Sequence, residues 1–143
     1  MGLHVIVPDA SVLVKWALRS TDEGDRESAL AIREAWLSGK CEIVVPSLWV
    51  YEVGNVLGSK EPLLASQLLE ILIQYHFEEE SAADFHGKIF ELMTGLKASF
   101  YDAACHAVAF RRNGTFVTAD DRYSRRAMRL GHVVTLRNWS AVL

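Results

Sequence analysis

Four acidic residues fall at similar places in the sequence, close to the ends of short apolar runs. Asp9 and Asp120 each lie just beyond such a run, whereas Glu52 and Asp102 lie in the opening turns of predicted helices. Carboxylates that converge from separate segments repel one another unless a cation lies between them, and hard oxygen ligands suit Mg²⁺ or Mn²⁺. Such a site favours phosphoryl-transfer chemistry, because a bound cation can activate a water molecule as the nucleophile and a second can stabilise the leaving oxygen.

Helix capping is the alternative interpretation for each of these acids taken alone. An acidic side chain at a helix start accepts hydrogen bonds from free backbone N–H groups and complements the helix dipole. Ser99 and Asp102 match the S-x-x-D capping pattern, as do Thr118 and Asp121. Asp121 also follows Asp120 directly, so either could be the fourth acid of the site, although the spacing from Thr118 favours Asp120. The functional interpretation therefore depends on the four acids as a group.

The elements that must position these acids alternate between strand and helix along the chain. Short apolar runs predict strands at Leu3–Val7, Glu42–Val45, Phe77–Glu80, Thr115–Thr118 and His132–Leu136, the third of which is acidic enough to suit only a sheet edge. Periodicity and capping signals predict helices at Ala10–Leu18, Arg26–Leu37, Ser47–Leu57, Leu63–Tyr75, Ala82–Leu96, Ser99–Arg112 and Arg122–Leu130. This alternation predicts an α/β fold, a parallel sheet with helices on both faces, formed by residues 1–143 as a single domain. Each helix that follows a strand then begins at the carboxyl edge of the sheet, where ligands usually bind.

Composition restricts the class of protein. The chain has 143 residues, of which 50% are hydrophobic, so it can bury a core and is not intrinsically disordered. The net charge of −3 excludes a uniformly basic protein that coats nucleic acid, but not a local basic strip. Cys41 and Cys105 form no CxxC pair, which excludes a disulfide scaffold and indicates a reducing, intracellular setting. No apolar run is long enough to span a membrane, and the first is interrupted by polar residues, unlike a signal peptide, so we expect a cytoplasmic protein without a membrane partner.

Four motifs together resemble a known family. They are the segment Val5–Trp16 (VIVPDASVLVKW), Glu52–Asn55 (EVGN), Tyr101–Ala104 (YDAA) and Phe116–Asp120 (FVTAD). In order and spacing they resemble the PIN domain, and within it the VapC-type toxins of bacterial and archaeal toxin–antitoxin pairs. The resemblance extends from about Leu3 to Asn138, and the first and last motifs carry most of its specificity.

The resemblance implies a fold, an activity and a set of site residues. The fold is a five-stranded parallel sheet of order 3-2-1-4-5, and the activity is that of an endoribonuclease that depends on Mg²⁺ or Mn²⁺. Its acidic catalytic and metal-binding positions are Asp9, Glu52, Asp102 and Asp120, and its supporting polar positions are Ser11, Asn55 and Thr118. The residue pattern agrees with these roles, because Asn55 shares a helical face with Glu52, and Ser11 and Thr118 can orient a carboxylate or a water molecule. Local hydrogen bonding at helix starts is the alternative for these two hydroxyls.

The sequence also suggests where substrate could bind. Arg122, Arg125, Arg126 and Arg129 are spaced to form one stripe on the helix that follows Asp120. Arginines beside an acidic site could hold the phosphates of an RNA substrate that the acids repel, although a simple solvated helix face has the same pattern. His106 lies one helical turn after Asp102, and we expect it to be packed or solvated rather than to join the site.

Partner proteins are expected from the apolar helices in the middle of the chain. The predicted helix Ser47–Leu57 is apolar nearly all round, so one face should meet the sheet while the other needs a cover. The helix Leu63–Tyr75 can supply this cover, and so can a partner chain. By resemblance to VapC-type toxins, these helices line a homodimer contact and a groove for a cognate VapB-type antitoxin.

Other classes of α/β protein fit the sequence less well. A phosphoacceptor receiver domain needs an acidic pair after its first strand and a lysine after a late strand, but Asp9 stands alone and the last strand runs into Leu136 and Arg137. A phosphatase with an Asp-x-Asp nucleophile motif needs a second acid where Ser11 stands. The last alternative is a non-catalytic PIN-like binding module. The presence of all four acids argues against it.

Overall fold

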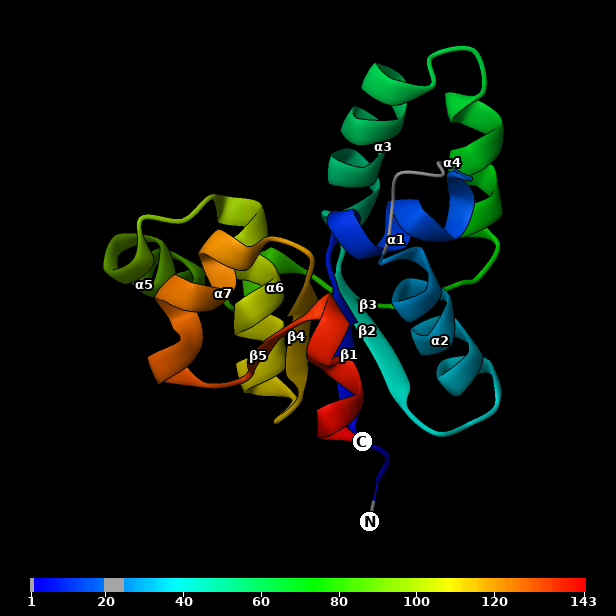
Figure 1. Ribbon diagram of the computed structural model, residues 1–143. Coiled ribbons are helices and arrows are strands. Elements are labelled where there is room, and N and C mark those ends of the chain that lie inside the picture. The colour runs from blue at the N-terminus through cyan, green and yellow to red at the C-terminus, as the bar shows by residue number, and fades with distance from the viewer. Residues whose placement is uncertain (1, 20–24) are drawn as a thin grey trace.

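The sheet of the computed structural model has the strand order that the sequence analysis expected. The structure describes residues 2–19 and 25–143 (Figure 1), and this part of the chain forms a five-stranded parallel sheet of order β3-β2-β1-β4-β5. The strands are β1 (Val5–Pro8), β2 (Glu42–Pro46), β3 (Glu78–Glu80), β4 (Thr115–Thr118) and β5 (Val133–Thr135). Because all strands run in one direction, their carboxyl ends lie at a single edge.

Helices connect the strands and lie on both faces of the sheet. The α-helices are α1 (Ala10–Ala17), α2 (Arg26–Leu37), α3 (Trp49–Lys60), α4 (Ala65–Ile73), α5 (His86–Leu96), α6 (Phe100–Arg111) and α7 (Asp121–Ala127). Short 3₁₀ helices follow β3, α7 and β5 and are η1 (Ala82–Asp84), η2 (Met128–Leu130) and η3 (Leu136–Val142). In Figure 1, helices α1 to α4 lie on one side of the sheet and α5 to α7 on the other. Each described helix is too short or too polar to cross a lipid bilayer.

Several predicted helix and strand ends are wrong. The predicted helix Arg122–Leu130 ends as α-helix at Ala127, and its last turn tightens into the 3₁₀ helix η2 before Gly131. Helix α3 begins at Trp49, with Leu48 rather than Ser47 at its N-cap, and the backbone N–H of Ser47 bonds to the carbonyl oxygen of Glu80 at 2.8 Å beside β3. The predicted last strand is shorter than expected, since Leu136 already belongs to η3.

The alternation of side chains along each strand divides the core into two layers. On β1, Ile6 packs with helices α1 to α4, whereas Val5 and Val7 pack with helices α5 to α7. The other two inner strands follow the same rule: Val45 faces the first layer and Phe116 the second. Both faces of the sheet are therefore buried, as expected for parallel strands with crossover helices.

A glycine allows the two central strands to approach. Gly114 precedes β4 and lies against β1, and a Cβ atom at this position would be 2.8 Å from the Cβ of Val5. Real Cβ atoms do not come this close, so a larger residue would push the strands apart. The close contact matters for the site, since β1 and β4 lead directly into Asp9 and Asp120.

The edge strand β3 consists entirely of glutamates and is held by cations and an indole. Arg111 Nε lies 2.8 Å from Glu80 Oε1, and one terminal nitrogen of Arg112 lies 2.6 Å from Glu78 Oε2 and 3.0 Å from Glu80 Oε2. The indole N–H of Trp49 donates to Glu79 at 2.6 Å. These contacts join the edge strand to the end of α6 and the start of α3, and they offset the negative charge of its three glutamates.

Candidate active site

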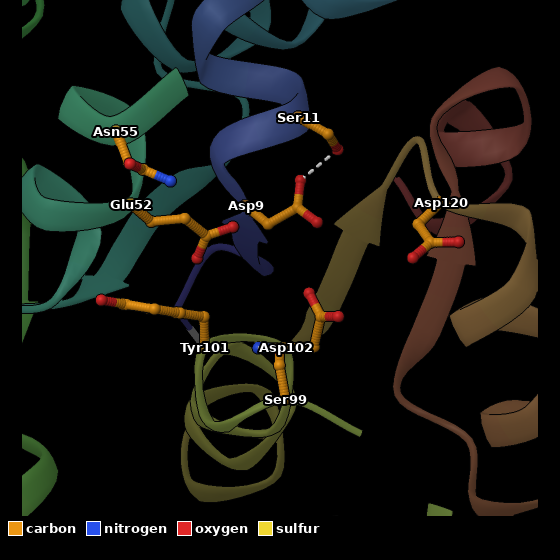
Figure 2. Close-up of a pocket in the computed structure, with 8 residues that line it drawn as sticks. All are labelled: Asp9, Ser11, Glu52, Asn55, Ser99, Tyr101, Asp102 and Asp120. Carbon is orange, nitrogen blue, oxygen red and sulfur yellow. Dashed lines mark hydrogen bonds between the residues drawn. The ribbon is translucent and has the colours of Figure 1, made fainter. Parts of the chain in front are cut away.

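The four acids of the sequence motifs line one cavity at the carboxyl edge of the sheet. The cavity has a volume of about 320 Å³ (Figure 2) and is lined by Asp9, Ser11, Glu52, Asn55, Ser99, Tyr101, Asp102 and Asp120. Figure 2 shows Asp9 in the middle, with Glu52, Asp102 and Asp120 on three sides of it. Each acid comes from a different segment, so only the folded chain brings them together.

Asp9 is the most buried and the most firmly held of the four. Its side chain also caps α1, accepting from the N–H of Val12 at 3.3 Å, and the residue is only 4% exposed. The Ser11 hydroxyl donates to one carboxylate oxygen, and the Thr118 hydroxyl donates to the other at 2.6 Å. Asp9 therefore caps α1 and lines the cavity at the same time.

Backbone groups fix the direction of these two hydroxyls. The N–H of Ala119 donates to Ser11 Oγ at 3.0 Å, and the N–H of Asp120 donates to Thr118 Oγ1 at 3.0 Å. Each hydroxyl oxygen already accepts a bond from the backbone and gives its own proton to Asp9. Ser11 and Thr118 thus orient Asp9, and Thr118 lies behind it, fully buried.

Helix α3 brings Glu52 and Asn55 to the same side of the cavity. The two residues are separated by about one helical turn, and both line the cavity. In Figure 2 the carboxyl group of Glu52 points toward Asp9, and the amide of Asn55 lies above it. The helix starts directly after β2, which is why these side chains reach the carboxyl edge.

The other two acids belong to the starts of α6 and α7. Ser99 caps α6 by accepting from the N–H of Asp102 at 3.1 Å, so the carboxyl group of Asp102 is left free to face the cavity. Asp120 caps α7, accepting from the N–H groups of Arg122 at 2.9 Å and Tyr123 at 3.4 Å, while it also lines the cavity.

The neighbouring acid Asp121 has a different environment. Its carboxylate lies 3.5 Å from a terminal nitrogen of Arg137 on η3, and the pair is exposed. Asp120, rather than Asp121, is the one of the two that lines the cavity with the other acids.

The cavity disfavours the ionised form of its acids. Burial, with a further contribution from Asp102, raises the pKa of Asp9 from 3.8 to about 6, against the lowering effect of the Ser11 and Thr118 hydroxyls. Burial and the charges of Asp9 and Asp102 raise the pKa of Glu52 from 4.5 to about 8. Burial and the charge of Asp120 raise the pKa of Asp102, and the Ser99 bond and Arg126 oppose this. These acids therefore repel one another and lack sufficient positive charge nearby.

The donor set fits a divalent cation by its chemistry. Four carboxylates with hydroxyl and amide oxygens around one cavity are the hard ligands that Mg²⁺ and Mn²⁺ prefer, and a cation would relieve the repulsion that raises the pKa values. Among the described residues, no three His, Cys, Asp or Glu side chains are close enough to hold one ion together. The side chains would thus have to turn inward from their present positions to share one.

The four arginines after Asp120 lie on two different elements, α7 and η2. Arg122, Arg125 and Arg126 line a second cavity of about 340 Å³, whereas Arg129 lies beyond the end of α7, in η2. One terminal nitrogen of Arg126 donates to the carbonyl oxygens of Leu96 at 3.0 Å and Lys97 at 3.1 Å. Three of the four predicted arginines thus share this cavity, and Arg126 also joins α7 to the turn between α5 and α6.

Sequence reasoning did not select two of the residues that line the first cavity. Ser99 was expected only to cap its helix, and Tyr101 belonged to a motif without a role of its own. Both flank Asp102 in the opening turn of α6, and this position was the available signal. His106 is packed as expected, fully buried and away from the cavity.

Comparison with known families identifies the fold. The family model of the PIN domain matches residues 6–128. The chain belongs to the PIN domain family. PIN domains are generally nucleases and generally use divalent metals. The match includes three of the four motifs completely and the first from Ile6 onward, and the four acids that line the cavity lie within it.

Solved structures share this PIN fold at low sequence identity. The structure of PAE2754 from Pyrobaculum aerophilum is 18% identical, with a TM-score of 0.64, and the match covers 99% of this chain and 95% of that one. The structure of VapC20 from Mycobacterium tuberculosis, a toxin that cleaves the sarcin–ricin loop, is 16% identical, with a TM-score of 0.63, and covers 84% of this chain and 93% of that one. A search of curated proteins found no match.

Proposed function

We propose that this PIN domain is an endoribonuclease that depends on a divalent metal and hydrolyses RNA phosphodiester bonds. The observation that supports this most is the convergence of Asp9, Glu52, Asp102 and Asp120 on one cavity, each from a separate element. Acids that only cap helices have no reason to share a cavity, and the pKa values of Asp9 and Glu52, raised by burial and by neighbouring carboxylates, support a cation as the group that would stabilise their ionised forms. The family and the fold it shares with a VapC toxin agree with the proposal.

Each group of residues that lines the cavity would have a separate role in this reaction. Asp9, Glu52, Asp102 and Asp120 would hold Mg²⁺ or Mn²⁺, which when bound supplies an activated water and charge stabilisation. Ser11 and Thr118 orient Asp9 through the bonds described above, and Asn55 adds an amide beside Glu52. These supports keep the acids in place when the negatively charged substrate approaches.

RNA phosphates would bind at the arginine cavity on α7. Arg122 lies in the first turn of α7 and Arg125 in its last turn, so the arginine cavity belongs to the same helix that Asp120 caps beside the acidic cavity. Arginine suits this role because its planar guanidinium group donates to two phosphate oxygens at once. The local positive charge is compatible with the net charge of −3, since the field that a phosphate meets is local.

The biological role we propose is that of a toxin in a VapBC-type pair, acting in the cytoplasm. A homodimer and a VapB-type antitoxin would cover apolar side chains that α3, α4 and the turn between them leave exposed, which are Tyr51, Leu63, Leu64, Ile71 and Ile73. Light scattering at micromolar concentration should give twice the mass of the chain, and a strictly monomeric mass would contradict the dimer.

Cleavage of total cellular RNA by the purified protein tests the activity. The reactions contain Mg²⁺, Mn²⁺ or EDTA, and Asp102→Asn is compared with Asp84→Asn, which removes an exposed carboxylate from η1. Discrete fragments that require both metal and Asp102, with Asp84→Asn fully active, would support the proposal. A defined RNA with the sarcin–ricin loop sequence belongs in the panel, because the M. tuberculosis neighbour cleaves that loop.

Absence of cleavage would be informative only for a folded protein without a bound partner. In that case RNA that binds without being cut, equally with EDTA and with metal, would favour the non-catalytic PIN-like binding module. The binding is measured by fluorescence anisotropy on the same RNA.

A further inference from the structure

A fully buried histidine and tyrosine connect the two helices that carry the last two acids. His106 of α6 and Tyr123 of α7 both have no exposed surface. His106 Nδ1 lies 2.7 Å from the Tyr123 hydroxyl, and His106 Nε2 lies 2.8 Å from the carbonyl oxygen of Gly131. The two rings also meet edge to face, with centroids 5.5 Å apart. Neither residue lines the cavity, so the proposed chemistry does not use them directly.

The partners fix which way the protons point. The carbonyl oxygen of Gly131 can only accept, so the ring of His106 carries its proton on Nε2. Burial lowers the pKa of His106, which leaves the ring neutral at pH 7 and Nδ1 without a proton. The Tyr123 hydroxyl therefore donates to Nδ1. One ring thus accepts from Tyr123 on α7 and donates to Gly131, which directly follows η2, and both of its nitrogens are satisfied.

Short connections lead from this pair to two of the four acids. Asp102 lies one helical turn before His106 on α6. The backbone N–H of Tyr123 donates to the carboxylate of Asp120 at 3.4 Å, and Asp120 caps the helix on which Tyr123 lies. The bond between His106 and Tyr123 therefore closes a path that runs from Asp102 to Asp120 through two helices.

Asp102 and Asp120 carry like charges at the starts of α6 and α7 and line the same cavity. In the metal-free protein their repulsion favours movement of α7 away from α6. Two contacts oppose that movement, the buried pair inside and, at the surface, the bonds from Arg126 to the carbonyl oxygens of Leu96 and Lys97. Helix α7 is only 7 residues long and also packs against α5 and β5.

We propose that His106 and Tyr123 are positioning residues that hold Asp120 at a fixed distance from Asp102 before a divalent cation binds. The proposal rests on the function proposed above, because it assigns the pair to the same metal site. Preorganisation of this kind strengthens metal binding, since the helices that carry the two acids need not move when the ion arrives and only the carboxylate side chains turn toward it.

Mn²⁺ binding to Tyr123→Phe, measured by calorimetry without RNA, tests the proposal. This substitution removes the hydroxyl and keeps the ring against Phe116, 5.3 Å away between centroids. We expect Mn²⁺ affinity to fall by about tenfold, the usual effect of losing a residue that supports a metal ligand. Tyr75→Phe is the matched control, because Tyr75 packs among aromatic rings in the other core layer, and its affinity should equal that of the parent.

Two combined variants separate positioning from a general loss of structure. In an Asp120→Asn background, Tyr123→Phe should have no further effect on Mn²⁺ affinity, because the acid that it positions is gone. His106→Leu should weaken binding to the same extent as Tyr123→Phe, and the double variant should be no weaker than either. A loss that persists in the Asp120→Asn background would overturn the proposal. Should Tyr123→Phe not fold, which circular dichroism detects, His106→Leu takes its place in both comparisons.

The outcomes also distinguish this inference from the function on which it rests. A parent protein that binds no Mn²⁺ overturns the proposed function and the positioning role with it. A parent that binds Mn²⁺, with Tyr123→Phe binding equally well, overturns the positioning role alone. Hydrogen exchange gives an independent readout, because the amides of α7 should exchange faster in Tyr123→Phe than in Tyr75→Phe, and equal rates contradict the proposal.

Discussion

The burial of Asp9 predicts that asparagine at this position stabilises the metal-free protein. Burial is the main reason that the pKa of Asp9 rises from 3.8 to about 6. Because the folded protein holds the proton more tightly than the unfolded chain, the destabilisation is absent below pH 3.8, grows as the pH rises toward 6, and is complete above it. At about 1.4 kcal/mol per pH unit between the two pKa values, the ionised carboxylate destabilises the fold by about 3 kcal/mol at pH 8.

Hydrogen bonding reduces this gain but does not remove it. The amide oxygen of an asparagine accepts from one of the Ser11 and Thr118 hydroxyls, whereas its NH₂ group faces the other, which loses its acceptor. One lost bond of this kind costs about 1 kcal/mol. We therefore expect Asp9→Asn to raise the free energy of unfolding by about 2 kcal/mol at pH 8. At pH 4 most of the folded Asp9 is protonated, so only a small part of the charge-related destabilisation is present, the lost hydrogen bond offsets it, and the gain disappears.

Urea unfolding in EDTA, at pH 4 and pH 8, measures this difference. With a slope of about 1–3 kcal/mol per molar urea, the midpoint of Asp9→Asn should lie about 1 M above that of the parent at pH 8. Asp84→Asn removes an equal charge from an exposed position and controls for net charge. A midpoint below that of the parent at pH 8, or an equal gain at both pH values, would refute the reasoning that burial makes this charge unfavourable.

Three further predictions concern the site and the sheet. Asp102→Asn should reduce RNA cleavage at least about hundredfold with an unchanged circular dichroism spectrum, because only its backbone N–H takes part in the cap of α6; cleavage at the parent rate contradicts the site. Arg125→Ala should weaken RNA binding and lower the slope of log affinity against log salt by about one, and an unchanged slope in anisotropy titrations would exclude its phosphate contact. Gly114→Ala should destabilise the fold by about 1–3 kcal/mol in thermal unfolding, because its Cβ would meet Val5, whereas Gly87→Ala, with open space around it, should not; equal melting temperatures contradict the close approach of β1 and β4.

The alternation of strands and helices could be predicted from the sequence, because buried strands and surface helices have different patterns of apolar residues. Runs such as Val5–Val7 are apolar at every position, which indicates strands buried on both faces, and these alternate with helical periodicity. The strand order itself came from the resemblance to PIN domains. The ends of the helices were harder to predict, because they depend on residues far away in the chain. Ser47 is a good capping residue, but it bonds through its N–H to Glu80 beside β3, and the helix starts later.

The convergence of the four candidate acids was predictable from the sequence, but their environment was not. Asp9 and Asp120 each follow a strand, Glu52 lies early in the helix after the second strand, and Asp102 lies in the first turn of the helix that leads into the next strand. These positions were enough to expect all four at one edge of the sheet, where they line one cavity. Nothing in the local sequence shows that Asp9 is 4% exposed, or that the Tyr123 hydroxyl meets His106, since these depend on packing between segments far apart in the chain. Arg126 shows the same limit, because its bonds to Leu96 and Lys97 arise from tertiary contact.

The all-glutamate edge strand has a consequence for how copies of this protein can associate. A free sheet edge normally invites another chain to add a strand, which leads to aggregation at the concentrations reached during synthesis. A second β3 docked here would set its three glutamates beside three others, and the ion pairs with Arg111 and Arg112 already occupy part of this edge. Growth of the sheet from molecule to molecule is thereby disfavoured at β3.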